Sequence, residues 1–118
     1  MWNLALDENH GPHLGGCGDC RGVVTIDSKT GAITRNPEYY ALGQASRFVR
    51  PGAWRIGATS TPDGIETVAY ANPDGTRVLI AFNAAAAAKD VDVTAEGRRF
   101  TYRLASHGAA TFRWRKPR

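Results

Sequence analysis

The sequence predicts a mainly β fold: an antiparallel β-sandwich over residues 51–118, preceded over residues 1–50 by the last strand, loop and helix of a (β/α)8 barrel. Three observations lead to this prediction. Short β-branched or aromatic runs separated by turn residues follow residue 50, a helix-start signal stands at residues 36–38, and a long glycine-rich loop precedes that signal. The composition, 42% hydrophobic and 22% charged over 118 residues, is ordinary for a small globular protein.

The first part of the chain alternates short strands with turns. Strands are expected at residues 4–6, 23–26 and 32–34, the last two joined by a hairpin turn at residues 28–31. A loop over residues 7–22, with five glycines, lies between the first two strands. Loops of this length in compact proteins are usually functional or disordered. A strand, a long polar loop and a later helix are typical of the end of a (β/α)8 unit, where binding groups follow the strand.

One helix is expected, over about residues 37–49. Asn36 is a capping residue type, Pro37 suits the first helical position, and Glu38 lies near the positive end of the helix dipole. Apolar residues recur near helical spacing within the segment, and Pro51-Gly52 ends it.

The rest of the chain reads as consecutive antiparallel strands. Six are expected, at residues 54–60, 65–71, 77–83, 91–94, 99–104 and 109–114. The alanine run at residues 84–88 is interpreted as a connection, because so short a run does not offset the cost of helix nucleation. Alternation along the strands predicts one buried face and one exposed face. The aromatic residues expected in the core are Trp54, Phe82, Phe100 and Phe112.

Four side chains in the glycine-rich loop are of types that bind zinc: His10, His13, Cys17 and Cys20. Their spacing matches no zinc-finger pattern, and a single Cys-x2-Cys is a weak signal, so zinc is the less favoured hypothesis. A disulfide between Cys17 and Cys20 and a loop of free thiols are equally open. Redox catalysis is disfavoured because glycines surround the cysteines, whereas a redox pair opens a helix.

The carboxylates of this sequence form no convincing catalytic pair. Glycoside hydrolysis with retention needs two carboxylates about 5–5.5 Å apart. The helix start explains Glu38, and strand or turn positions facing solvent explain Glu66 and Glu96. Asp7 and Glu8 are adjacent in sequence and cannot easily face each other across a bond. No catalytic residue is therefore expected among these residues.

Charge and hydropathy exclude several other functions. The net charge is +4, but the late arginines fall mostly on alternate strand positions without aromatic stacking partners, so nucleic-acid binding is not favoured. The longest uncharged apolar stretch, residues 78–88, is far shorter than the roughly 20 residues that cross a bilayer. The N-terminal residues lack the pattern of a signal peptide, and the sequence predicts no location in the cell.

Several longer runs of the sequence are familiar. In the first half they are Trp2-Asn3-Leu4-Ala5-Leu6-Asp7, Gly11-Pro12, Gly16-Cys17, Cys20-Arg21-Gly22-Val23-Val24-Thr25-Ile26, Glu38-Tyr39-Tyr40-Ala41-Leu42-Gly43 and Ser46-Arg47-Phe48-Val49. In the second half they are Pro51-Gly52-Ala53, Arg55-Ile56, Asn72-Pro73-Asp74-Gly75, Asn83 and Thr111-Phe112-Arg113-Trp114. Over nearly its whole length the chain resembles glycoside hydrolase family 30, in its glucosylceramidase and β-1,6-glucanase branch.

The resemblance implies a retaining β-glycosidase whose (β/α)8 barrel carries two catalytic glutamates ahead of the matched region. It implies no cofactor. The first partner that it implies is that barrel, and the second is the β-linked glucoside substrate, of carbohydrate or sphingolipid metabolism, that the barrel would bind. Trp2 would line the sugar pocket at the end of the last barrel strand, with Cys17 in a loop nearby. His10 stands where the family often has glycine, and His13 where asparagine is common. Members of the family are commonly secreted or lysosomal.

This resemblance leads to the hypothesis of a C-terminal fragment whose sandwich supports a barrel and is not itself catalytic. The alternative is a stand-alone carbohydrate-binding or interaction module. Because the family also borrows sandwich strands from the N-terminal end of its chain, the resemblance implies an unpaired sheet edge here, and with it marginal stability or self-association.

Overall fold

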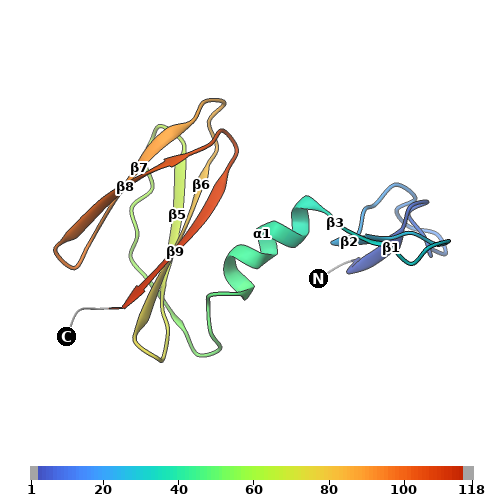
Figure 1. Cartoon of the computed structure of the whole chain (residues 1–118), viewed down its shortest axis with the longest axis horizontal. Helices are drawn as coiled ribbons and strands as arrows, with labels where there is room; N and C mark the ends of the chain where they lie inside the picture. The colour runs from blue at the N-terminus through green and yellow to red at the C-terminus, as the bar shows by residue number, and fades with distance from the viewer. Residues whose placement is uncertain (1–2, 116–118) are drawn as a thin grey trace. The chain divides into compact units, whose positions relative to one another are not determined.

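The computed structural model describes residues 3–115, which form nine strands and one helix (Figure 1). The mainly β, antiparallel character predicted from the sequence is confirmed. The chain divides into two compact units, Met1–Gly43 and Gln44–Arg118.

The first unit contains a small three-stranded sheet in the order β1-β2-β3. Its strands are β1 (Ala5–Asp7), β2 (Val24–Ile26) and β3 (Ile33–Arg35). β1 and β2 run parallel, while β2 and β3 form the antiparallel hairpin expected from the turn at residues 28–31. The Asp27 carbonyl accepts a hydrogen bond from Gly31 N at 2.8 Å, which closes that turn.

The helix α1 (Pro37–Ser46) begins where the sequence predicts and ends three residues earlier than expected. The amide group of Asn36 does not cap it but donates to the Gly22 carbonyl at 2.8 Å and to Thr25 Oγ1 at 3.0 Å. The Tyr39 amide instead bonds to the Asn36 backbone carbonyl at 2.9 Å. Asn36 thereby fixes the helix start to strand β2. Within residues 3–115, no helix is long and apolar enough to cross a membrane.

The second unit is built on a four-stranded antiparallel sheet in the order β4-β5-β6-β9. Its strands are β4 (Trp54–Ile56), β5 (Ile65–Ala71), β6 (Thr76–Asn83) and β9 (Ala109–Arg115). β4 is shorter than the predicted strand at residues 54–60. Beyond Ile56, side-chain bonds replace the backbone ladder: Ser60 Oγ accepts from Thr67 N at 2.9 Å, and the Thr59 carbonyl accepts from Thr67 Oγ1 at 3.0 Å.

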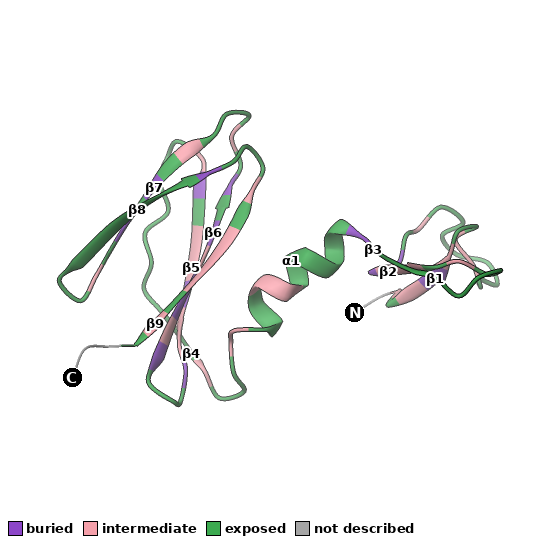
Figure 2. Ribbon diagram, viewed as in Figure 1, coloured by how far each residue is buried: buried purple, intermediate pink, exposed green. Residues whose placement is uncertain are grey.

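A separate two-stranded sheet faces this one and consists of β7 (Lys89–Ala95) and β8 (Arg98–Leu104). The hairpin turns at Glu96 and Gly97, whose φ angles of 53° and 77° are the two positive values of a tight I′ turn. The core of the unit lies between the two sheets and comprises Ile65, Ala69, Leu79, Ala81, Val91, Val93 and Leu104. Figure 2 shows buried positions along these strands, whereas α1 has none.

The aromatic residues predicted for this core are mostly elsewhere. Phe112 packs against the core cluster, but Trp54 is 77% exposed on the edge strand β4 and Phe100 is 42% exposed on β8. Phe82 is also exposed, because it alternates with the inward-facing Ala81 and so lies on the opposite face of β6. The prediction was wrong for these three residues. Small aliphatic side chains fill the space between the sheets instead.

The alanine run at residues 84–88 is a connection without helix, as predicted. Asn83, which is fully buried, organises it. Its Oδ1 accepts from Ala85 N at 3.0 Å, and its Nδ2 lies within hydrogen-bonding distance of the carbonyls of Ala87, Ala105 and Leu104, at 2.8, 3.0 and 3.3 Å. One side chain therefore satisfies the backbone of two connections that carry no ladder of their own.

Candidate functional site

The glycine-rich loop begins with a tight turn at the end of strand β1. The Asp7 carboxylate accepts hydrogen bonds from Asn9 N at 2.9 Å and Gly11 N at 2.7 Å. The Asp7 backbone bonds in addition to Gly11 O and His10 N, at 2.7 and 3.1 Å. Asp7 thus holds the turn through its Oδ1 atom.

The loop returns through Gly22, which passes directly beside strands β1 and β2. A Cβ atom at this position would lie 2.6 Å from the Val24 carbonyl oxygen and 2.8 Å from Leu6 N. Both atoms belong to the backbone and cannot move aside, so a side chain does not fit there. The close approach of Gly22 to β1 and β2 therefore fixes the positions at which the loop leaves β1 and returns to β2.

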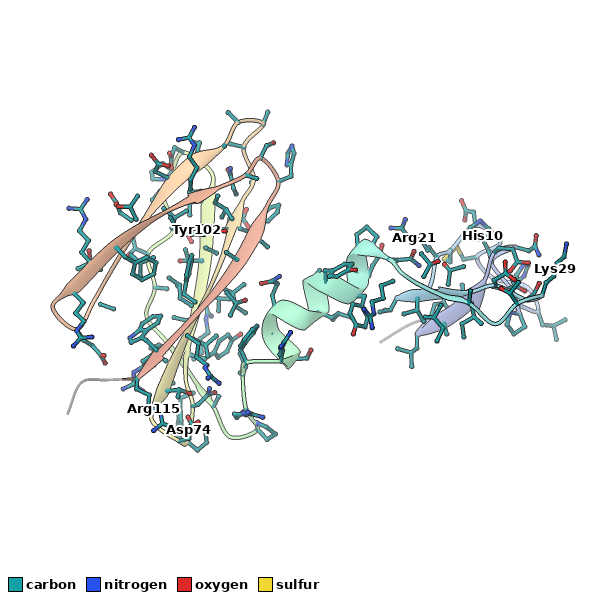
Figure 3. The ribbon with its side chains drawn as sticks, in the orientation of Figure 1. His10, Arg21, Lys29, Asp74, Tyr102 and Arg115 are labelled. Carbon is teal, nitrogen blue, oxygen red and sulfur yellow. A yellow bond between two sulfur atoms is a disulfide. The ribbon has the colours of Figure 1, made fainter. Side chains whose placement is uncertain are left out.

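A disulfide joins Cys17 to Cys20 within the loop. His10 Nδ1 lies 3.1 Å from the Cys20 carbonyl oxygen, which ties the start of the loop to its end. Figure 3 shows His10 and Arg21 in this region of the first unit. A cleft of about 360 Å³ lies against the loop. Its lining residues are Asn3, Leu6, His10, Pro12, His13, Leu14, Gly15, Gly16 and Cys17.

The four side chains considered for zinc do not form a ready ligand set here. Zinc binds cysteine as the thiolate, and both sulfur atoms are engaged in the disulfide. His10 also directs Nδ1 to a backbone carbonyl. Across residues 3–115, no group of three or more histidine, cysteine or acidic side chains is arranged to hold a metal ion.

Glu8, the next carboxylate after Asp7, is bound to the turn of the β2–β3 hairpin. It accepts hydrogen bonds from Ser28 Oγ at 2.5 Å and Ser28 N at 2.9 Å. The bond from the Ser28 hydroxyl is the main reason that the pKa of the Glu8 carboxyl lies below its usual range. Glu8 is therefore ionised at neutral pH, opposite to the raised pKa of a general acid.

The remaining glutamates lie in ion pairs or at an exposed strand position. Glu38 pairs with Arg21 at 2.7 Å, and the Arg21 guanidinium lowers the pKa of that carboxyl. Glu96 lies 3.7 Å from Arg77, and Glu66 is exposed on β5. In the described part of the chain, Asp7, Glu8 and Glu38 thus all serve local structure. Trp2, the other residue predicted to line the pocket, lies outside the described residues.

One polar centre of the second unit has no local signal in the sequence. Asn72 is buried in the turn between β5 and β6, and its side chain reaches the segment that follows α1. Its Nδ2 donates to Phe48 O at 2.9 Å, and its Oδ1 accepts from Arg50 N at 3.0 Å. These bonds satisfy backbone groups of the segment after Ser46, in which the sequence predicted that the helix would continue. The Asn-Pro-Asp-Gly motif signalled a turn, but nothing local signalled this distant contact.

The same turn is fixed from its other side by Asp74. Its carboxylate accepts from Thr76 N at 2.9 Å and Thr76 Oγ1 at 2.6 Å, and the hydroxyl bond is the main cause of its lowered pKa. Gly75 has a φ of 81°, a left-handed conformation that favours glycine at this point of the turn. Figure 3 shows Asp74 and Arg115 at this end of the sheet, and Arg115 adds to the lowering of the Asp74 pKa.

A further contact holds the end of α1 against strand β9. The Thr111 hydroxyl lies 2.6 Å from Gln44 Oε1 and 3.1 Å from the Gln44 carbonyl oxygen. Together, Asn72 and Thr111 attach the last turn of α1 and the residues after it to the four-stranded sheet.

These features define a class of protein: a β-sandwich domain preceded by a strand, a disulfide-containing loop and a helix. Residues 52–112 match the family model described as the glycosyl hydrolase family 30 β-sandwich domain. The chain therefore belongs to glycoside hydrolase family 30, as the resemblance in the sequence indicated.

Relatives of known identity include endo-1,6-β-D-glucanase neg1 of Aspergillus fumigatus, 42% identical over 89 residues. That match covers 70% of this chain and 18% of the relative. The lysosomal acid glucosylceramidase of Mus musculus is 33% identical over 98 residues, covering 79% of this chain and 18% of the relative. The chain thus spans less than a fifth of the length of these proteins.

Solved structures agree over almost the whole chain. The endo-β1,6-glucanase BT3312 matches with a TM-score of 0.87 and 37% identity, covering 98% of this chain and 26% of that one. SrfJ from Salmonella typhimurium matches with a TM-score of 0.92 and 32% identity, with the same coverage of both chains.

Proposed function

We propose that this chain is the C-terminal part of a retaining β-glycoside hydrolase of the glucosylceramidase or β-1,6-glucanase type, in which the sandwich supports a catalytic barrel without being catalytic. The observation that carries the proposal is the attachment of α1 to the family 30 sandwich. In this proposal, residues 1–50 are the last strand, loop and helix of the barrel, and residues 51–118 are the sandwich.

The contacts at the end of α1 support a holding role. Asn72 and Thr111 bind main-chain atoms of Gln44, Phe48 and Arg50 with three hydrogen bonds of 2.9–3.1 Å. Bonds to backbone groups fix position whatever side chains are nearby. A barrel helix attached in this way is held at its C-terminal end by the sheet.

Exposed apolar side chains on α1 support the proposal that a partner covers this helix. Tyr39, Tyr40 and Leu42 are large and apolar, and all three are exposed, with Tyr40 at 58%. In a (β/α)8 barrel, helices pack with their apolar sides on the strands and on neighbouring helices. The catalytic barrel of the enzyme is therefore the partner that we propose for this helix, and a β-linked glucoside is its substrate.

We further propose that Trp2 and Cys17 belong to the wall of the sugar pocket. Cys17 lines the cleft beside the disulfide loop, and this loop follows strand β1, where a barrel places its binding groups. Trp2 lies three residues before the first residue of β1, and its indole offers an aromatic face of the kind that sugars stack on.

Two assays on the purified chain test the non-catalytic role. With 4-nitrophenyl β-glucoside and with β-1,6-glucan we expect no product above the buffer rate, while a family 30 endo-1,6-β-glucanase serves as the positive control. Calorimetric titration with β-1,6-linked gluco-oligosaccharides should show no saturable heat. Turnover would contradict the proposal, and saturable binding without turnover would replace it with a carbohydrate-binding module.

The supporting role itself is tested in the polypeptide that includes the barrel. Thr111→Val removes the hydroxyl donor to Gln44 and keeps the shape of the side chain. We expect this variant to lose activity faster on heating while its KM stays the same. Thr94→Val, an exposed hydroxyl on β7, is the matched control and should behave as the parent. Equal heat resistance of both variants would contradict the support by Thr111.

A further inference from the structure

One segment of the glycine-rich loop, residues 12–19, makes few contacts with the rest of the first unit. Every residue in it is exposed. Among residues 3–115, no hydrogen bond between two backbone groups involves this segment. A Cβ atom built at Gly15 or at Gly16 would meet no atom within 4 Å beyond its chain neighbours. Packing and backbone hydrogen bonds therefore do little to fix the position of residues 12–19.

Both flanks of this segment are held by hydrogen bonds. On its N-terminal side, Asp7 binds the backbone of Gly11 through its carboxylate and its own N–H group, both at 2.7 Å. On its C-terminal side, the Cys20 carbonyl oxygen lies 3.1 Å from His10 Nδ1. The disulfide from Cys17 to Cys20 attaches the segment to this second flank. Breaking that bond releases the segment while the flanks stay in place.

The segment is also one wall of the cleft beside the loop. All of residues 12–17 line this cleft, whose volume is about 360 Å³. The opposite side comes from Asn3, Leu6 and His10, which belong to strand β1 or adjoin it in the first unit. The disulfide therefore controls the position of one wall, whereas hydrogen bonds of the small sheet and of the Asp7 turn fix the other.

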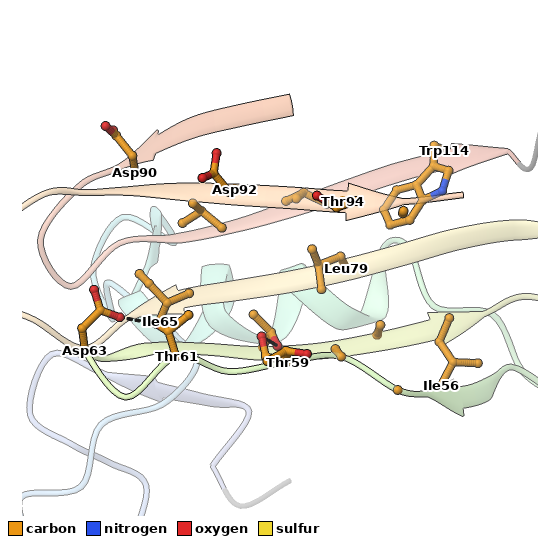
Figure 4. Close-up of a pocket in the computed structure, with 17 residues that line it drawn as sticks. Ile56, Thr59, Thr61, Asp63, Ile65, Leu79, Asp90, Asp92, Thr94 and Trp114 are labelled. Carbon is orange, nitrogen blue, oxygen red and sulfur yellow. Dashed lines mark hydrogen bonds between the residues drawn. The ribbon is translucent and has the colours of Figure 1, made fainter. Parts of the chain in front are cut away.

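The larger hollow of the second unit is built differently. It has a volume of about 490 Å³ and lies between β7 and the segment from β4 to β5 (Figure 4). Backbone ladders hold the strands that line it, and Lys89 of β7 pairs with the Asp63 carboxylate across it at 2.8 Å. Its shape thus depends on many bonds at once. The cleft beside the loop is the one of the two whose wall depends on a single reversible bond.

The disulfide is open to exchange with thiols. Cys17 is exposed and Cys20 is partly exposed, and exposed disulfides are among the labile ones. Asp19 Oδ1 lies 3.1 Å from Cys17 Sγ, which carries no hydrogen while it is bonded in the disulfide. After reduction, the Cys17 thiol can donate a hydrogen bond to that oxygen. This contact favours the reduced state, because it becomes a hydrogen bond only there.

We infer that the Cys17–Cys20 disulfide is a redox switch that sets the affinity of the cleft for its glucoside. The inference rests on the proposed function, in which this cleft belongs to the sugar pocket. In the oxidised state the wall is already in position. In the reduced state, binding must first order residues 12–19, and this loss of conformational entropy weakens the affinity. The chemical step is unaffected, because the proposal places the catalytic glutamates on the barrel.

A dithiol drives the switch. One of its thiolates attacks Cys17 Sγ, the bond between the two sulfur atoms breaks, and Cys20 leaves as a thiolate that takes up a proton. The second thiolate of the reagent then attacks the mixed disulfide. This step closes the reagent's own disulfide and releases Cys17, which takes up the second proton. Two electrons pass from the dithiol to the protein, and a small-molecule disulfide such as oxidised glutathione reverses the reaction.

Titration with glutathione tests the redox part of the inference on the full chain. The chain is equilibrated in mixtures of reduced and oxidised glutathione, free thiols are alkylated, and mass spectrometry gives the reduced fraction. We expect this fraction to rise from near zero to near one across the mixtures. A structural disulfide resists reduction by glutathione. A chain that stays oxidised in every mixture would therefore overturn the inference.

Kinetics of the polypeptide that includes the barrel test the affinity. The KM and kcat are measured in the oxidised and the phosphine-reduced states, with whichever of 4-nitrophenyl β-glucoside and β-1,6-glucan it hydrolyses faster. We expect reduction to raise the KM about tenfold and to leave kcat within about twofold, the pattern of lost uniform binding. The Cys17→Ser, Cys20→Ser variant should have the raised KM in both conditions, which controls for other effects of the phosphine.

The outcomes separate this inference from the proposed function. An oxidised polypeptide without activity would overturn both. An active polypeptide with the same KM in its two redox states would overturn the inference alone. A fall in kcat at constant KM would also overturn it, because the disulfide would then act on the chemical step. Chemical reduction of the parent needs no substitution, so the test holds even if the double variant fails to fold.

Discussion

Different interactions stabilise the interior of each of the two units of the chain. Residues Gln44–Arg118 enclose a cluster of seven buried apolar side chains between two sheets. In Met1–Gly43, by contrast, the buried apolar residues among those described are Leu6 and Val23, and turns of Asp7, Glu8 and Asp27 carry most of the side-chain hydrogen bonds. The disulfide adds one covalent link to that first unit.

This difference has a physical consequence. Burial of apolar area is the main source of folding free energy, whereas exposed hydrogen bonds contribute little because water competes for them. The second unit therefore has its own basis for cooperative folding. The first unit has few buried apolar side chains among the described residues and is stabilised mainly by hydrogen bonds and the disulfide.

Matched leucine substitutions test the comparison with the largest effect. Leu79 and Leu6 are both 8% exposed, one in each unit. We expect Leu79→Ala to lower the free energy of unfolding of the second unit by about 3 kcal/mol, through lost burial and a cavity. Leu6→Ala should leave that transition unchanged. Urea unfolding with fluorescence detection measures both, and an equal shift would show that the two units unfold as one.

Replacement of Asn83 tests whether the second unit also depends on a buried polar centre. Asn83→Ala removes the partner of several backbone groups in the two connections that it joins, and we expect a cost of about 2 kcal/mol. Ser106→Ala removes one exposed bond to Ala85 O and is the control, with a change under about 0.5 kcal/mol. Similar values for both variants would mean that water replaces the Asn83 bonds.

Reduction of the disulfide should affect the first unit alone. Because the bond closes a short loop between Cys17 and Cys20, its chain-entropy contribution is about 2 kcal/mol. We expect a phosphine reductant to speed hydrogen exchange in residues 10–22 without moving the unfolding midpoint of the second unit. The Cys17→Ser, Cys20→Ser variant should match the reduced chain. Unchanged exchange in that loop would show that the Asp7 turn and His10 hold it without the disulfide.

The smallest effect concerns pH. The lowered pKa of Glu8 means that its bonds to Ser28 stabilise the folded first unit above the ordinary glutamate pKa of 4.5 and are lost as the pH falls through the lower folded value. We expect Ser28→Ala to raise the pKa of Glu8 toward 4.5, as measured by NMR titration of its carboxyl carbon. Glu38, whose pKa is lowered by Arg21, is the internal control and should titrate as before.

Local sequence signals predicted much of this fold. The strand at residues 65–71 was predicted with its observed bounds, because alternating apolar residues and a turn at each end mark it. The helix start at Pro37 was equally clear. Trp54 was misplaced, because burial depends on which strand ends a sheet, and Asn72 was missed as a helix anchor, because its partners lie more than twenty positions away.

The site was less predictable than the fold. Two cysteines separated by two residues allow a disulfide, free thiols or metal binding, and spacing alone does not choose among them.

The most direct test of the central proposal is to read the coding sequence upstream of Met1. The proposal predicts an in-frame (β/α)8 barrel of roughly 250 residues with two glutamates at the ends of barrel strands. An in-frame stop codon and a separate promoter immediately upstream would contradict it, and the chain would then be a free-standing sandwich of family 30 ancestry.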